Sequence, residues 1–193
     1  MATGATDVYF SADIETDGAI PGPNSILSFA MTYAGAFDGV NFVVPMDYST
    51  SFYRELKPIS DEFDPDAIAV NGLDRERLLL EGADPKDAMT EAALWVKEIS
   101  GSGTPVLVAY PLSFDWSWLY WYFVRFSELG SPFGFSKCFD IKTAIAAKFG
   151  RTIATSGRDR LPYELKSGMR HTHHALDDAV EQAVIFSKVF AKE

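Results

Sequence analysis

The sequence of 193 residues contains a single cysteine, Cys138. One cysteine excludes a disulfide within the chain, which favours a cytoplasmic protein over a secreted one. The first six residues contain neither a basic segment nor an apolar run, so we expect no signal peptide. Apolar stretches such as 118–124 are far shorter than the ~20 residues that a membrane-spanning helix needs. These absences predict a cytoplasmic protein with no membrane partner.

Basic residues are scarce relative to acidic ones, with 17 Lys and Arg against 27 Asp and Glu and a formal net charge of −10. This balance excludes a protein that coats nucleic acid by bulk charge. The basic residues are nevertheless concentrated in Lys137–Arg170, which holds eight of them against three acidic residues. A local groove that binds a polyanion therefore remains compatible with the composition.

The chain also lacks internal repeats, low-complexity tracts and an evident linker, which predicts a single domain over residues 1–193. Strand-like runs occupy 8–12, 26–33, 40–44, 52–56 and 105–109. Helical patterns occupy 66–70, 74–80, 85–99, 116–129, 141–149 and 175–190. This order predicts an α/β fold, with a mixed sheet flanked by helices. The polar stretch 151–172 is irregular, and loops of this length are often functional or mobile.

Two acidic residues, Asp13 and Glu15, follow the first expected strand. Side chains two apart on a strand point to the same face. Two carboxylates on one face repel each other unless a cation lies between them, and hard oxygen ligands suit Mg²⁺ or Mn²⁺. Taken alone, the pair is better explained as the solvated end of a strand.

A third acidic residue, Asp115, follows the expected buried strand 105–109 and lies between Phe114 and Trp116. It marks the junction of a strand and a helix, where an aspartate commonly caps the helix. Capping and a chemical role are equal alternatives for this residue.

All three histidines lie within His171–His174, just before the last expected helix. With Asp177 and Asp178 nearby they could form a zinc site, although the sequence offers no evident fourth ligand. Alternatively, one histidine is a general base, with an ordinary pKa near 6.5, beside a metal-binding aspartate. The third interpretation is a set of surface histidines followed by acidic residues that the helix dipole favours.

The order of these motifs is far more specific than any one of them. Asp-x-Glu-Thr-x-Gly after the first strand, Phe-Asp after a mid-chain strand and His-x-Ala-x-x-Asp at the last helix resemble the DEDDh 3′→5′ exonucleases of the ribonuclease H-like fold. The residues that carry this resemblance are Asp13, Glu15, Asp115, His173 and Asp178. It extends over segments 52–58, 66–74 and 138–143, and it implies a central mixed five-stranded sheet.

The resemblance implies hydrolysis of the terminal phosphodiester bond at a nucleic acid 3′ end, with release of 5′-mononucleotides. Two Mg²⁺ ions, for which Mn²⁺ can substitute, would assist the reaction. In that scheme Asp13 bridges both ions, and Glu15 and Asp178 bind the ion that carries the attacking water. Asp115 helps to hold the second ion, and His173 accepts the proton of the water.

We expect four substrate-binding residues: Thr16 as part of the resemblance, Trp116 as the aromatic residue of its helix nearest the site, and Arg158 and Arg160 because they lie in the basic stretch before His173. Thr16 would contact the terminal nucleotide, Trp116 would stack on a base, and Arg158 and Arg160 would bind phosphates. The expected substrate is a single-stranded 3′ end, of DNA slightly ahead of RNA, and the aromatic helix after Asp115 is compatible with a homodimer.

The motif spacing sets Asp17, Asp177 and His171 aside as peripheral. Where many family members carry His-Asn before the Phe-Asp motif, this chain has Tyr110-Pro111, and the basic segment before the last motif is replaced by 161–165. Three alternatives remain: an inactive nucleic-acid-binding module, an exoribonuclease or oligoribonuclease, and a zinc hydrolase built on the histidines.

Overall fold

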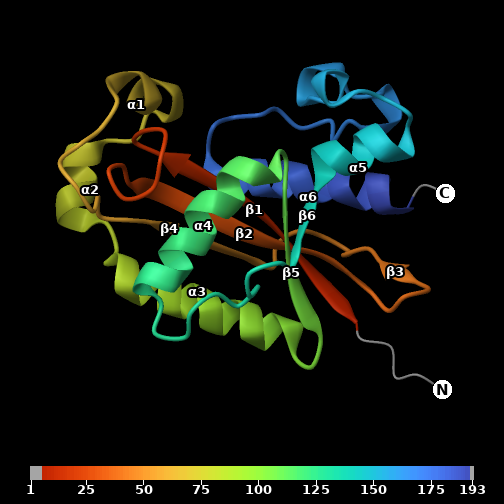
Figure 1. The fold of residues 1–193 in the computed structure, drawn as a ribbon, viewed down its shortest axis with the longest axis horizontal. Coiled ribbons are helices and arrows are strands. Elements are labelled where there is room, and N and C mark those ends of the chain that lie inside the picture. The colour runs from red at the N-terminus through yellow and green to blue at the C-terminus, as the bar shows by residue number, and fades with distance from the viewer. Residues whose placement is uncertain (1–5, 192–193) are drawn as a thin grey trace.

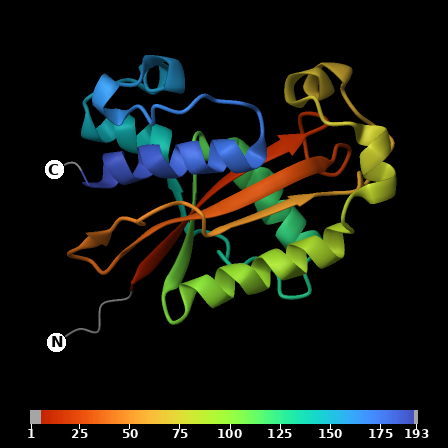
Figure 2. The ribbon, with the colours of Figure 1, turned by 180° about the vertical axis from the view of Figure 1, so that it is seen from behind.

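One twisted sheet runs through the molecule, and helices cover both of its faces (Figure 1, Figure 2). The computed structural model describes residues 6–191. Residues 1–5 and 192–193 lie outside the described part. Residues 1–5 make up most of the N-terminal segment in which we expect no signal peptide. The strands are β1 (Asp7–Thr16), β2 (Ile26–Phe37), β3 (Phe42–Val43), β4 (Ser51–Glu55), β5 (Thr104–Ala109) and β6 (Cys138–Asp140). The helices are α1 (Pro65–Asn71), α2 (Arg75–Glu81), α3 (Pro85–Ser100), α4 (Leu112–Phe126), α5 (Ile141–Lys148) and α6 (Ala175–Ala191).

The central strand β1 pairs with β2 on one side, antiparallel, and with β5 on the other side, parallel. β6 continues the parallel part of the sheet beside β5. β3 and β4 both pair with the outer edge of β2, at different ends of that strand. The sheet is therefore mixed and five strands wide, which confirms the predicted fold class.

Successive side chains of β1 point to opposite faces of the sheet, and this alternation divides the apolar core into two layers. Phe10 faces α3 and α4, where it packs with Trp118 and Phe123. Tyr9 faces the other side and packs with Phe186 of α6. Most of the aromatic side chains of α4 therefore belong to the core, and the homodimer stays a prediction.

Two elements differ from the sequence-based expectation. β6 was not predicted, because three residues are too few to show a strand period. α4 begins at Leu112, after Pro111 at the N-cap position, so Asp115 lies within the first turn and the capping interpretation of Asp115 is wrong. The irregular stretch after α5 contains three single turns of 3₁₀ helix, at 153–155, 158–160 and 163–165.

Asp17 lies just past the end of β1 and has a structural role. Its carboxylate is fully buried, pairs with the buried Nε of Arg75 at 3.0 Å, and accepts a hydrogen bond from the backbone N–H of Ser25. Arg75 also donates to the carbonyl of Ser60. This ion pair connects the loop after β1 to α2.

Among residues 6–191, no helix has the length and apolar character needed to cross a membrane.

Replacing Asp17 with alanine should lower the free energy of unfolding by about 3 kcal/mol, because it leaves the buried guanidinium of Arg75 without its carboxylate. Urea denaturation measures this loss. Glu91→Ala is the matched control, since the Glu91–Arg54 pair is half exposed and its loss should cost less than about 1 kcal/mol. Equal losses in the two variants would contradict the structural role of Asp17.

Candidate active site

Asp13 and Glu15 lie on the part of β1 that extends beyond its neighbour β5. The parallel pairing with β5 ends at Ser11, whereas the antiparallel pairing with β2 continues past Glu15. One side of the strand is therefore left without a partner strand at the two carboxylates. Both side chains are nevertheless almost fully buried, because α4 and α6 cover this end of the sheet.

Asp115 reaches the same place from α4. β5 ends at Ala109, the chain turns through the cis peptide Tyr110–Pro111, and α4 begins immediately. Asp115 is buried in the first turn of this helix and accepts a hydrogen bond from the backbone of Ile14. The strand-to-helix junction therefore places a third carboxylate beside β1.

Asp178 is supplied by the first turn of α6. Ala175 and Ala179 pack on Ala30 of β2, and these small side chains let the helix approach the sheet closely. Asp178 is completely buried. Its two oxygens accept hydrogen bonds from the backbone N–H groups of Thr172, at 3.0 Å, and His173, at 2.9 Å.

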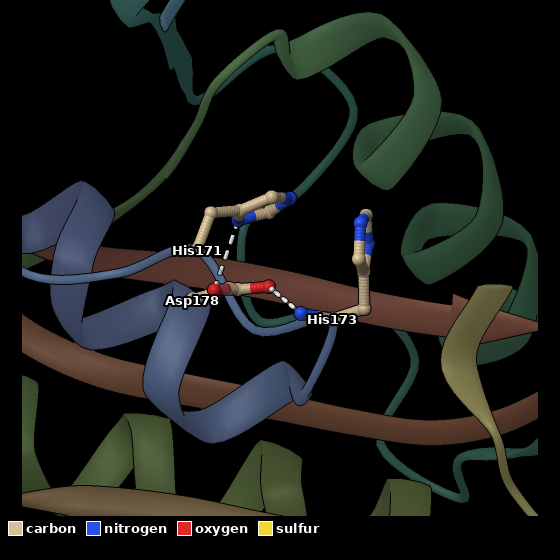
Figure 3. A group of neighbouring side chains, drawn as sticks. All are labelled: His171, His173 and Asp178. Carbon is tan, nitrogen blue, oxygen red and sulfur yellow. Dashed lines mark hydrogen bonds and ion pairs between the residues drawn. The ribbon is translucent and has the colours of Figure 1, made fainter.

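The backbone at His173 adopts a left-handed conformation, with φ of 56°. The segment before α6 consequently turns around the carboxylate of Asp178, and the rings of His171 and His173 lie on the same side of it (Figure 3). Nδ1 of His171 is 2.9 Å from Oδ1 of Asp178. His173, the predicted general base, is exposed on the wall of the cavity.

Three of the carboxylates, from Asp13, Glu15 and Asp178, offer oxygens that all lie within 4.8 Å of one another. Burial, followed by the charges of Asp115 and Glu15, raises the pKa of Asp13 well above its usual value. Burial, followed by the charges of Asp178 and Asp115, raises the pKa of Glu15 to about 8. Burial raises the pKa of Asp115 to about 7. Without a cation, these groups resist ionisation near neutral pH.

A cavity of about 420 Å³ opens onto this cluster. The acidic wall consists of Asp13, Glu15 and Asp115, and the cationic side chains that line it are Lys142 and Arg158. Tyr110 also lines the cavity, and its hydroxyl donates to the carbonyl of Ser156 at 2.7 Å. That bond connects the end of β5 to the irregular segment 151–172.

Of the four predicted substrate-binding residues, one lines the cavity and three do not. Arg158 faces the cavity and pairs with Glu181 of α6 at 3.0 Å. Arg160 pairs with Asp159 at the surface, Trp116 stacks on Tyr120, and the hydroxyl of buried Thr16 donates to the carbonyl of Gly18. These last three residues are not part of the cavity wall, and their roles in substrate binding stay predictions.

The structure brings further residues to the site. Gln182 donates to Oδ1 of Asp13 at 2.6 Å, and its position four residues after Asp178 on one helix face could have indicated this. His171 was expected to be peripheral, but it lies on the cavity wall and contacts Asp178. Burial, followed by the charge of Arg158, lowers the pKa of His171. Nothing in the sequence indicated that Lys142 lines the cavity, because only the fold brings the start of α5 to this place.

No model of a known protein family matches the chain. A curated relative, the 3′-5′ DNA exonuclease Cap18 of Escherichia coli, is 34% identical over 182 residues, which cover 93% of this chain and 90% of the relative.

Solved structures show the same fold at lower identity. The 3′-exonuclease that recognises the histone mRNA stem-loop matches with a TM-score of 0.66 at 13% identity, over 98% of this chain and 83% of the other. E. coli exonuclease I in complex with a dT13 oligonucleotide matches with a TM-score of 0.63 at 16% identity, over 95% of this chain but only 40% of the other. The cell-death related nuclease CRN-4 matches with a TM-score of 0.64 at 15% identity, over 97% of this chain and 64% of the other.

The fold, the buried carboxylates and the extended similarity to Cap18 agree with one another, and the chain belongs to the DnaQ-like family of 3′→5′ exonucleases.

Proposed function

We propose that this protein hydrolyses the terminal phosphodiester bond at the 3′ end of DNA and releases 5′-mononucleotides, with divalent metal ions as cofactors. The observation that carries the proposal is the burial of four carboxylates from β1, α4 and α6 in one cluster, beside a cavity whose wall includes Asp13, Glu15, Asp115 and two histidines. The preference for DNA rests on the activity named for Cap18, which is similar along almost the whole chain.

The donor set fits two hard divalent cations. Carboxylate oxygens suit Mg²⁺ and Mn²⁺, and the raised pKa values of Glu15 and Asp115 indicate an excess of buried negative charge that cations would offset. Asp13, Glu15 and Asp178 would hold one ion, and Asp115 together with Asp13 the second. When bound, two such ions stabilise the charge on the attacking and leaving oxygens.

His173 is the residue that we assign as the proton acceptor. Its ring is exposed to the cavity, while its backbone N–H is fixed on Asp178. A neutral imidazole at this place can accept the proton of the attacking water and release it to solvent. Asp178 thus orients the base as well as supplying a ligand.

The substrate phosphates would lie along the cationic wall. Arg158 pairs with Glu181, and Nζ of Lys142 has no ion-pair partner among the described residues. Cations at these positions attract a phosphate backbone into the cavity. Arg160, Trp116 and Thr16 are proposed to contact nucleotides beyond this wall.

The direct test is digestion of 5′-labelled oligonucleotides by the purified protein. We expect single-stranded DNA with a free 3′ hydroxyl to shorten stepwise in Mg²⁺ or Mn²⁺, to persist in EDTA, and to shorten faster than RNA of the same sequence. Digestion that continues in EDTA, or that proceeds equally with a blocked 3′ end, would exclude the proposed reaction.

Two neighbouring aspartates provide a matched control for this test. Asp178→Asn removes a buried ligand and should reduce turnover by at least about 100-fold, more than the loss of an outer-sphere partner usually costs. Asp177→Asn changes the exposed neighbour on the same helix turn and should retain activity. Similar losses in both variants would contradict the assignment.

Replacing His173 with alanine should reduce the rate by roughly 10²–10⁴-fold, the usual range for loss of a general base. Binding of Mn²⁺, measured by calorimetry, should be largely retained, since the carboxylates are unchanged. His174→Ala is the control, because the ring of His174 stacks on Tyr53. If His174→Ala reduces the rate as much as His173→Ala, the base is not His173.

A further inference from the structure

A second group of metal-ligating side chains adjoins the carboxylate cluster. His171, His173 and Asp178 each offer a ligand atom, and these atoms lie within 4.8 Å of one another. The two imidazole rings meet edge to face, with centroids 4.5 Å apart. Figure 3 shows both rings on the same side of the Asp178 carboxylate. The sequence placed Asp177 and Asp178 near the histidines, and the fold brings Asp178 within reach of both rings.

We propose that His171, His173 and Asp178 form a binding site for Zn²⁺ that is distinct from the all-oxygen site and shares Asp178 with it. Imidazole nitrogen suits Zn²⁺, whereas Mg²⁺ prefers oxygen. Two histidines and one carboxylate are a ligand set known for zinc, with the fourth position left to water.

The local backbone holds this group together. Thr172 and His173 both donate their backbone N–H groups to Asp178, so the segment that carries the two histidines is fixed on the third ligand. Both histidines are exposed to solvent. Rotation of these side chains can bring the nitrogens to the ~2.0–2.1 Å that zinc requires.

Acidic side chains near the group favour a cation, whereas Lys142 and Arg158, which line the same cavity, oppose it. Oε2 of Glu181 lies 3.6 Å from Nδ1 of His171, and the carboxylates of Asp13 and Glu15 lie on the same cavity. The guanidinium of Arg158 also contacts Nδ1 of His171. Binding through this nitrogen requires Arg158 to withdraw onto Glu181, with which it already pairs.

Zinc at this site would inhibit the exonuclease reaction, a consequence that rests on the proposed function. Asp178 would be drawn away from the ion that it shares with Asp13 and Glu15. His173 would lose the lone pair that accepts the proton. The site therefore makes the proposed activity sensitive to free Zn²⁺ in the presence of excess Mg²⁺.

The test measures Zn²⁺ binding to the full chain by competition with a chromogenic chelator, in millimolar Mg²⁺ and without nucleic acid. We expect one Zn²⁺ per chain, an affinity at least about 10-fold weaker in His171→Ala, wild-type affinity in His174→Ala, and a smaller loss in Glu15→Gln than in His171→Ala, because Glu15 adds charge to the cavity but no ligand. If His171→Ala binds zinc as wild type does, or if Glu15→Gln weakens binding more than His171→Ala does, zinc occupies the carboxylate site and the proposal is overturned.

Two further measurements keep the outcome independent of variant folding and of the proposed function. Co²⁺ bound to the wild type should give the intense visible absorption of a tetrahedral ion with nitrogen ligands; the weak spectrum of an octahedral all-oxygen site would overturn the proposal.

In the DNA digestion assay, His171→Ala should need at least about 10-fold more Zn²⁺ for half-inhibition. Zinc binding at His171 without any DNA digestion by the wild type would refute the exonuclease proposal alone.

Discussion

Repulsion among four buried carboxylates is the constraint on which the rest of this structure depends. Asp13, Glu15, Asp115 and Asp178 converge from three elements that are far apart in the sequence, and each is at least nine-tenths buried. A single paired guanidinium, that of Arg158, offsets little of this charge. Such a cluster is stable near neutral pH only if its members hold protons or bind cations, and the second option accounts for the donor set and the cavity.

The geometry that buries the carboxylates also gives a substrate access to them. β1 extends past β5, so the sheet leaves a gap that α4 and α6 cover, and Phe114 and Asp115 of α4 line the cavity that opens there. Segment 151–172 closes one flank of the cavity. Two side chains connect this segment to the rest of the fold. Tyr110 donates a hydrogen bond to the carbonyl of Ser156, and Glu181 pairs with Arg158 and accepts a hydrogen bond from Ser167.

The order and spacing of the motifs predicted the acidic residues through their resemblance to the DEDDh exonucleases, since no motif taken alone required a chemical role. Asp13 and Glu15 share a strand face, and His173 and Asp178 share the turn that opens α6. The position of His171 could not be predicted in this way, because it depends on the left-handed backbone at His173, which residue type does not indicate. Lys142 was missed for a different reason: β6, which leads into α5 beside the cavity, is too short to predict.

The most direct test of the account is the melting temperature of the wild type between pH 5 and 8, in EDTA and in Mg²⁺. In the metal-free fold the pKa values of Glu15 and Asp115 are about 8 and about 7, above those of the unfolded chain, so the folded state binds more protons and loses stability as the pH rises. Mg²⁺ binds the ionised carboxylates, and the gain in melting temperature that it gives should therefore grow from pH 5 to pH 8. A gain that is absent, or that does not change with pH, would contradict the claim that divalent cations hold the carboxylate cluster together.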